Sequence, residues 1–300
     1  VYAVTIGTGD SAVTFGGENV LPFHSFEGIT PSRPLIAHEI QDVPPSDWPE
    51  NVQKVFAGVS DDPVKWAKYC QDELKAKAIA LRLIGTHPDR ENRSAEDAAK
   101  TVKEVLAAIN IPLIILGSNH AEKDSSILVA AAEAAKDRNC IIGKAQEANY
   151  KTVAAAAMAN NHKLIAMSEL DINLSKQLNI LITQMGFDKE RVVTDPMCSA
   201  LGYGLEYTYS VMERIRLAAL TQNDVTMQQP LMGDVGMYVW KVKETTASEA
   251  DLPQWGSAEE RGIAWEAETA TALLISGAEL LIMRHPKAVS ALEKLIEELI

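Results

Sequence analysis

The sequence predicts an α/β fold in which eight strand–helix units close into a (β/α)8 TIM barrel. Eight short, mostly apolar runs alternate with helical segments, as expected for parallel strands that are covered on both faces. The chain of 300 residues has the length of one such barrel. An open doubly wound sheet is the alternative, but no G-x-G-x-x-G follows the first strand and no G-x-x-x-x-G-K-[ST] is present. The predicted strands span residues 34–39, 78–84, 112–117, 139–143, 163–168, 191–195, 224–228 and 279–284.

The helices between these strands are predicted from capping signals and apolar periodicity. Ser94 and Ser257 each precede an acidic residue at the third helical position, which is typical of a capping box. Pro63 suits the first turn of a helix, and Gly186 suits a helix end. The predicted helices span 62–76, 94–109, 124–137, 148–160, 171–186, 204–220, 257–276 and 286–299.

Residues 1–20 precede the repeat and alternate apolar with small polar residues around Gly9-Asp10, which predicts a β-hairpin. We therefore expect an N-terminal hairpin lid over residues 1–30, at the bottom of the barrel, and one barrel domain over residues 31–300. The one long irregular segment, 229–255, is expected at the functional face after the seventh strand. Its Met, Tyr and Trp content suits a binding surface, although an extra covered loop would look the same.

Composition excludes several classes of function. The formal charge of −13 argues against nucleic acid and anionic membranes as partners, and no apolar run of membrane-spanning length is present. The three cysteines lie far apart without a C-x-x-C, which excludes a self-contained zinc ribbon or iron–sulfur loop and indicates a reducing, cytoplasmic location. We expect each cysteine to be a small buried apolar residue and not a nucleophile. Cys198 is the possible exception, because it follows a predicted barrel strand.

In a barrel, the site is built from the residues that follow each strand. Here these residues are polar but mostly neutral, with few convergent acids and bases. Four of them are histidines, which follow different strands and lack an H-E-x-x-H spacing, so helix-end or surface positions are favoured over a metal site. The charged and histidine positions among them are His38, Glu39, His87, His120, Lys144, Glu169, Asp195, Asp234, Arg284 and His285.

The stretch from Thr194 to Arg216 is the most distinctive of these strand ends. A short apolar run ends at Asp195-Pro196, and a loop containing Gly202 and Gly204 leads into a long helix. Asp195 is a candidate acid or hydrogen-bond acceptor, or else a cap for the following helix, and of the two we favour the cap.

Two classes of function fit this pattern. One is an enzyme that binds a flat, amide-rich ring such as a pterin through Asn119 and Asp195. The other is a non-catalytic barrel whose mouth packs against a large cofactor or another subunit. The number of acidic residues at the strand ends distinguishes the two classes, because the polar edge of a pterin requires several carboxylates or amides. Strands two and four instead offer Leu83-Ile84-Gly85 and Ile142-Gly143-Lys144.

Three runs carry a resemblance to a known family. They are Ile84–Asp97 (IGTHPDRENRSAED), Pro112–Asn119 (PLIILGSN) and Asp195–Arg216 (DPMCSALGYGLEYTYSVMERIR). Together they resemble the small subunit of the corrinoid iron–sulfur protein, whose archaeal counterpart is the delta subunit of the acetyl-CoA decarbonylase/synthase complex. The family barrel is also similar to pterin-binding methyltransferases and dihydropteroate synthase, from which this chain departs in lacking acids at strands two and four.

The resemblance implies an anaerobic, heterodimeric methyl carrier of the acetyl-CoA pathway of carbon fixation. The cobalt corrinoid (a cobalamin-type cofactor) would be shared with a large subunit that also holds the four-iron cluster. The expected partners are that large corrinoid iron–sulfur subunit, a methyltetrahydrofolate methyltransferase, acetyl-CoA synthase and a reductive activator. This chain would shield the cofactor, with no catalytic residue of its own and methyl transfer left to the cobalt. The alternative is a pterin-binding methyltransferase. The expected cofactor-binding residues are Thr86, His87, Ser118, Asn119, Lys144, Asp195, Met197, Tyr203, Gly204, Gln229 and Met232.

Overall fold

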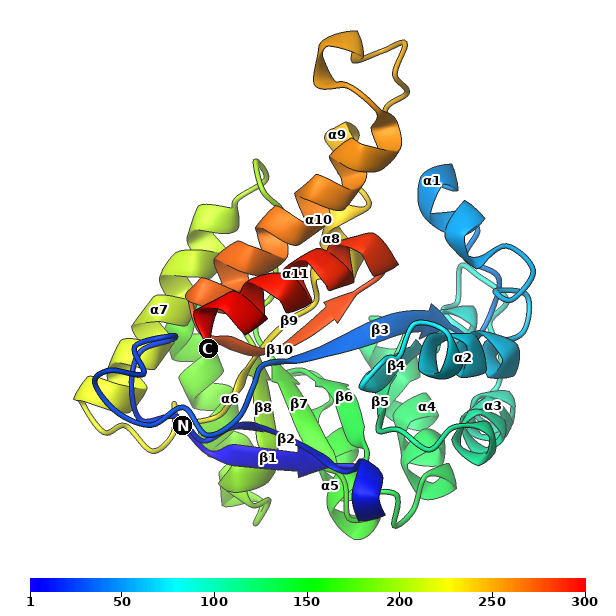
Figure 1. Ribbon diagram of the computed structural model, residues 1–300. Coiled ribbons are helices and arrows are strands. Elements are labelled where there is room, and N and C mark those ends of the chain that lie inside the picture. The colour runs from blue at the N-terminus through cyan, green and yellow to red at the C-terminus, as the bar shows by residue number, and fades with distance from the viewer.

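A computed structural model describes residues 1–300 and confirms the barrel (Figure 1). Eight parallel strands close in the order β10-β3-β4-β5-β6-β7-β8-β9, with a separate antiparallel hairpin at the N-terminus. Each strand therefore neighbours the next one along the chain, and β10 pairs with β3 to complete the circle. The barrel strands are β3 (Leu35–Gln41), β4 (Ala78–Arg82), β5 (Leu113–Leu116), β6 (Ile141–Ala145), β7 (Lys163–Met167), β8 (Val192–Asp195), β9 (Leu231–Gly233) and β10 (Ala278–Met283).

A ring of helices covers the outside of the barrel, close to the predicted positions. Ser94 forms a capping box with Asp97, and Ser257 accepts a hydrogen bond from the Glu260 backbone. No helix, the 18-residue α10 included, is both long and apolar enough to cross a membrane. The ring consists of α2 (Pro63–Asp72), α3 (Ala95–Ala108), α4 (Ala121–Ala134), α5 (Tyr150–Ala159), α6 (Ile172–Gln184), α7 (Leu205–Thr221), α10 (Ala258–Ile275) and α11 (Pro286–Leu299).

The predicted start of one helix, at Asp124, is wrong. Helix α4 begins at Ala121, and the side chain of His120 caps it by accepting a hydrogen bond from the Lys123 backbone. The carboxylate of Asp124 turns back instead and accepts from the backbone of Ser118 and Asn119. Asp124 therefore holds the loop after β5 rather than starting the helix.

The seventh strand was predicted at 224–228 and lies instead at Leu231–Gly233, as β9. The predicted residues form a turn, in which the Asp224 side chain accepts hydrogen bonds from the backbone and hydroxyl of Thr226. The segment 229–255 is accordingly not one irregular loop. It contains β9 and two short helices, α8 (Val235–Val239) and α9 (Lys243–Thr246). A further short helix, α1 (Glu50–Gln53), follows β3 and was not predicted.

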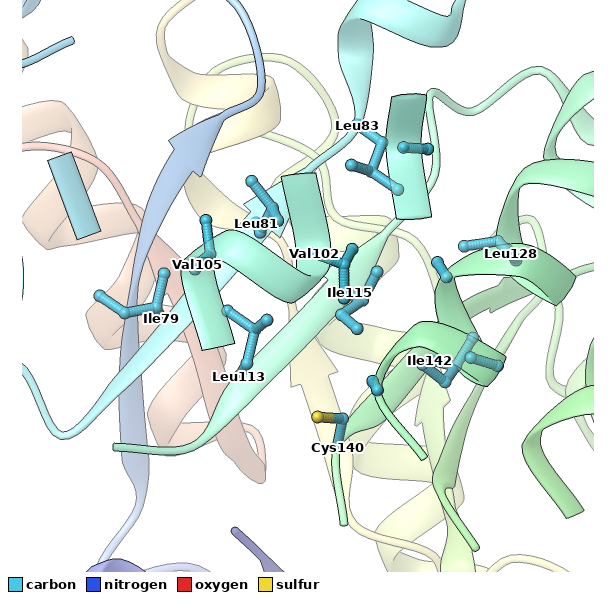
Figure 2. Close-up of a cluster of buried hydrophobic side chains, with 14 of the residues drawn as sticks. Ile79, Leu81, Leu83, Val102, Val105, Leu113, Ile115, Leu128, Cys140 and Ile142 are labelled. Atoms are coloured by element: carbon cyan, nitrogen blue, oxygen red, sulfur yellow. The ribbon is translucent and has the colours of Figure 1, made fainter. Parts of the chain in front are cut away.

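Side chains that alternate along each strand form two apolar layers. The outward set packs against the helices, as Figure 2 shows for Ile79 and Leu81 of β4 and Ile115 of β5 beneath Val102 and Val105 of α3. The inward set fills the barrel. It comprises Leu35, Ala37, Ala78, Ala80, Ile114, Leu116, Ile141, Ile165, Val193, Met232, Leu280 and Ile282.

The predicted N-terminal hairpin is confirmed as β1 (Ala3–Ile6) and β2 (Val13–Gly16), and it lies against the bottom of the barrel. Its backbone bonds to Gln228, just before β9, and to Asn139, just before β6. Both contacts lie at the amino ends of the strands. Val4, Ile6 and Phe15 extend the inward apolar layers from below and are fully buried.

This sealing role predicts a large effect of truncating Phe15. Replacing Phe15 with alanine removes a fully buried ring, so Phe15→Ala should lower the free energy of unfolding by about 3–5 kcal/mol in urea titrations. Phe26→Ala is the matched control, because Phe26 is 80% exposed, and it should change stability by less than about 0.5 kcal/mol. A loss below about 1 kcal/mol in Phe15→Ala would contradict a packed lid.

Candidate functional site

A layer of six charged side chains caps the apolar interior at the carboxyl ends of the strands. The Arg82 guanidinium donates to Glu39 at 2.9 Å and to both carboxylate oxygens of Asp234 at 2.8 and 2.9 Å. The Lys144 ammonium lies 2.6 Å from Asp234 and 2.9 Å from Asp195. The Arg284 guanidinium donates to Glu39 at 3.0 and 3.1 Å. These six residues are called the charged layer below.

The alternation of side chains along the strands places all of these charges except Lys144 inside the barrel. Lys144 lies two residues beyond the outward-facing Ile142, and the register of β6 shifts between Ile142 and Ala145. Glu39 lies two residues beyond Ala37 and Arg82 two residues beyond Ala80, and both alanines face inward. Asp195 and Asp234 stand in the same relation to Val193 and Met232. The sequence therefore changes from apolar to charged as each of these strands reaches its carboxyl end.

Within the buried charged layer, opposite charges favour the ionised forms of Asp234 and Lys144. Although burial opposes ionisation of Asp234, Arg82 and Lys144 hold its pKa well below its usual range. Burial likewise opposes the charge on Lys144, but Asp195 and Asp234 raise its pKa well above its usual value. Burial raises the pKa of Asp195, which has only Lys144 as a cationic neighbour within bonding distance. Lys144 is therefore a permanent cation and not a candidate general base.

Arg284 is held from outside the charged layer as well. Its guanidinium lies over the ring of Trp48, 4.4 Å from the ring centre. The carboxylate of Glu266, from α10, accepts hydrogen bonds from the backbone of Arg284 at 2.7 Å and of His285 at 2.9 Å. Burial raises the pKa of Glu266 to about 7. These contacts fix the end of β10 against the segment that contains α1.

Of the predicted site residues, Lys144 and Asp195 lie in the charged layer. Strand β6 extends to Ala145, so Lys144 belongs to the strand and not to the loop after it. The preference for Asp195 as a helix cap is wrong. Gly204 precedes α7 with a φ of 96°, while Asp195 accepts from the Met197 backbone and pairs with Lys144. Asp195 is therefore an acceptor within the site, the alternative first considered for it.

Thr86, His87, Ser118 and Asn119 lie on two neighbouring loops at the rim of the barrel mouth. Thr86 is buried and donates to the Leu83 backbone, and the Ser118 hydroxyl donates to Asp124, so both hydroxyls serve the loops themselves. The ring of His87 lies edge-on to that of His120, with centres 5.5 Å apart. The amide side chain of Asn119, at a φ of 70°, makes no hydrogen bond within the chain. The Nδ1 atom of His87 accepts a hydrogen bond from the Asp89 backbone at 3.1 Å. The Nε2 atom of His87 and the amide of Asn119 are thus the groups here that remain free to contact a ligand.

The loop between β8 and α7 carries three further predicted residues. Met197 is half-buried with a φ of 66°, and Gly204 turns the chain into α7. Tyr203 is 49% exposed, and its hydroxyl donates to Glu244 at 2.9 Å. Tyr203 therefore ties this loop to α9 beside the mouth.

The placement of Gln229 and Met232 after a strand is wrong, because β9 begins later than predicted. Gln229 precedes β9, at the amino end of the barrel, where its side-chain carbonyl accepts from Asn179. Met232 lies within β9 and is 1% exposed, with its side chain packed inside the barrel. Neither residue is at the mouth.

A groove of about 580 Å³ lies beside the mouth, between the loop after β6 and helix α6. Half of its ten lining residues are apolar, among them Leu174 and Met167. Gln146 and Gln177 also line it, and neither side-chain amide is hydrogen-bonded within the chain. The groove thus combines apolar area with amides that are free to pair.

All three cysteines are buried and unpaired, as predicted for small apolar side chains. Burial holds the pKa of Cys198 well above its usual value, so this thiol is protonated and is not a nucleophile. The side chains of His120 and His285 each accept a backbone hydrogen bond at a helix start, as expected for helix-end histidines.

Sequence reasoning singled out Glu39, Asp234 and Arg284 as strand-end residues but did not place them in a site, and it missed Arg82 altogether. A signal was present, because Arg82 interrupts the apolar run 78–84 at an inward position. A charge inside a predicted barrel strand requires a partner of opposite charge on another strand. Trp48 and Glu266, which support Arg284 from distant segments, carried no such signal.

Comparison with known proteins finds one family along nearly the whole chain. A sequence model described as "CO dehydrogenase/acetyl-CoA synthase delta subunit" matches residues 3–296. The acetyl-CoA decarbonylase/synthase complex subunit delta 1 of Methanosarcina thermophila is 35% identical over 298 residues, which cover 98% of this chain and 67% of that protein. Subunit delta of Methanothermobacter thermautotrophicus is 34% identical, over 99% of this chain and 75% of its own length.

Solved structures with the same fold include dihydropteroate synthases. The enzyme of Xanthomonas albilineans has a TM-score of 0.59 at 16% identity, covering 90% of this chain and 94% of its own. That of Thermus thermophilus has a TM-score of 0.56 at 12% identity, covering 98% of each chain. At these identities the likeness establishes the barrel fold alone.

The charged layer predicts that Asp234→Asn will be strongly destabilising. The substitution removes the charge that neutralises both Arg82 and Lys144, so the free energy of unfolding should fall by about 3–5 kcal/mol in denaturant titrations. Asp10→Asn, at an exposed position of the hairpin turn, is the control and should have little effect. Equal stability of the two variants would show that the pairs do not hold the mouth together.

His38 predicts a specific dependence of stability on pH. It lies on the outer face of β3, 3% exposed, and burial lowers its pKa from 6.5 to about 4. Between these values the unfolded chain binds the proton and the folded chain does not, so His38 makes stability fall as the pH falls. The stability of the wild type relative to His38→Gln should therefore drop by about 3 kcal/mol from pH 7 to pH 4. A difference that does not change with pH would contradict this assignment.

Proposed function

The chain belongs to the CO dehydrogenase/acetyl-CoA synthase delta subunit family, and from this premise we propose that it is the small subunit of a corrinoid methyl carrier. In this proposal the barrel mouth shields a cobalt corrinoid that a larger subunit holds. The chain itself carries out no chemistry. The observation that carries the proposal is the charged layer, because it closes the mouth with carboxylates that are already paired with cations.

The charged layer argues against a substrate chamber inside the barrel. Beneath it the interior is filled by apolar side chains, and its own carboxylates are committed to arginine and lysine. A ring with a polar edge, such as a pterin, would have to compete with these ion pairs for Asp195 or Asp234. A mouth of this kind favours covering a ligand over enclosing one.

The rim of the mouth suits a corrinoid. Such a ring has an apolar face and is surrounded by amide arms, each of which offers a donor and an acceptor. The side-chain amides of Asn119, Gln146 and Gln177 offer the complementary groups and make no hydrogen bonds within the chain. Met167 and Leu174 provide apolar area in the same groove. These residues would hold the edge of the ring.

When bound, the corrinoid supplies a nucleophilic cobalt that accepts a methyl group and passes it on. The residues of this chain exclude water and oxidants from the face that they cover. They do so with neutral groups, so a partner can displace the barrel without breaking buried ion pairs. The methyl group would come from methyltetrahydrofolate through a methyltransferase and go to acetyl-CoA synthase, with the four-iron cluster on the large subunit and a reductive activator as a further partner.

Co-purification from the native source tests this proposal. We expect a larger cluster-bearing subunit to accompany this chain, and the visible absorbance of the corrinoid to be lost from the chain when the two are separated. The alternative is a pterin-binding methyltransferase. A colourless chain that is isolated alone and binds a methylpterin tightly would establish that alternative and overturn the shielding role.

Two amide substitutions test the assignment of the rim. In the reconstituted complex, Gln146→Ala and Asn119→Gly should each speed the loss of corrinoid absorbance about three- to tenfold, as expected for one lost hydrogen bond. Glycine is chosen at 119 because the φ of 70° there would strain alanine. Gln184→Ala, at the exposed far end of α6, is the control for an amide away from the mouth. Rates equal to the control would place the corrinoid elsewhere.

A further inference from the structure

One side of the mouth carries a fourth cation that the charged layer does not neutralise. Lys241 follows α8, is exposed, and lies near enough to Arg284 and Arg82 for both to disfavour its charge. Burial of part of the side chain, together with these two arginines, lowers the pKa of Lys241. Four cations thus face three carboxylates, in a chain whose overall charge is −13.

The hydrogen bonds of Lys241 point to a missing acceptor. The only acceptor that the chain offers to the exposed ammonium of Lys241 is the sulfur of Met237, at 3.7 Å. The same sulfur is 3.9 Å from a nitrogen of Arg284. A thioether is a weak acceptor and Met is a flexible side chain. Two cations therefore converge on a position that a neutral sulfur fills poorly.

A second, independent observation concerns Arg82. One of its terminal nitrogens, Nη1, has no hydrogen-bond partner within the chain. Water cannot replace that partner, because Arg82 is 0% exposed. On the adjacent strand Gln41, which pairs with Arg82 in register, has a buried side-chain oxygen that is also without a partner. Unpaired buried groups of this kind are rare and costly. The mouth therefore has one unused buried donor, Nη1 of Arg82, and one unused buried acceptor, the side-chain oxygen of Gln41.

The nearby acids do not supply the missing charge. Asp47, which faces Lys241, pairs with Arg90 at 3.1 Å. Asp234 is shared between Arg82 and Lys144, and Glu39 between Arg82 and Arg284. The convergence of Lys241 and Arg284 thus remains without a counter-charge from within the chain.

We propose that this side of the mouth binds one oxyanion, of the phosphate or carboxylate class, between Lys241 and Arg284. The anion takes the place of the Met237 sulfur, which swings aside, and lies toward the unpaired nitrogen of Arg82. Charge-assisted hydrogen bonds from an ammonium and a guanidinium are the usual way in which proteins hold such groups. The site does not depend on the corrinoid role, and only the source of the anion does.

Titration with inorganic phosphate tests the site directly. Calorimetry on the whole chain, at constant ionic strength adjusted with chloride, should give saturable binding with one site per chain. Lys241→Gln should weaken the binding about tenfold or more, as expected for the loss of a charged hydrogen bond. Lys243→Gln is the matched control, because Lys243 is exposed two residues away and its ammonium makes no contact within the chain, and it should leave the affinity unchanged.

Two further variants keep the result decisive. Lys241→Arg should restore most of the affinity, and Met237→Ala should raise it, because the competing sulfur is gone. The absence of saturable binding in the wild type would overturn the proposal. Equal affinities of Lys241→Gln and Lys243→Gln would also overturn it, because phosphate would then be attracted by general charge only.

Two sources of the anion, the corrinoid tail and a free anion, can be distinguished in the complex with the large subunit. A complete corrinoid carries a phosphodiester in its nucleotide tail, whereas a cobinamide does not. If the tail supplies the anion, Lys241→Gln should speed the loss of the complete corrinoid and leave cobinamide unaffected. If both ligands are retained as in the wild type while phosphate binding is lost, the site serves a free anion. Failure of the complex to hold either corrinoid would count against the carrier role and not against the anion site.

Discussion

The pairing of Arg82 with Glu39 and Asp234 is the constraint on which the mouth of the barrel depends. Each of these groups is fully buried, and an isolated charge there would cost several kcal/mol. The three charges are therefore stable only together, which requires β3, β4 and β9 to end at one level. Lys144 and Asp195 extend the same requirement to β6 and β8, and Arg284 extends it to β10. The charged layer is thus neutralised only when the barrel is closed, because its charges come from different strands.

The two ends of the barrel are closed by different physical means. At the bottom, Phe15 and its neighbours in the hairpin continue the apolar interior and keep water out through packing. At the top, apolar packing gives way to the ion pairs of the charged layer. Binding groups are therefore confined to the rim, where Asn119 and Gln146 lie on loops that the strands position and do not bury. In the proposed carrier role, this rim would contact a ligand that the larger subunit holds.

Most of the fold could be predicted because seven strands are apolar runs flanked by clear helix signals. The exception, β9, has three residues between Pro230 and Asp234, too few to show a pattern, while the turn at Asp224–Thr226 resembled a strand in composition. That one displacement misplaced Gln229 and Met232. The charged layer was harder to predict for another reason. Lys144 and Asp234 are 90 residues apart in sequence, and only closure of the barrel brings them together.

The excess of one cation at the mouth follows from how the charged layer is assembled. Each carboxylate inside the barrel is matched by a cation on another strand, so any further cation that approaches from outside must find its partner elsewhere. Lys241 approaches from the segment after α8, which begins directly after Asp234 and is placed by the same ion pairs. Its position beside Arg284 is therefore imposed by the fold and is not a chance surface arrangement. Within the chain the ammonium of Lys241 has a methionine sulfur as its only acceptor, and the proposed anion would supply the counter-charge that this sulfur lacks.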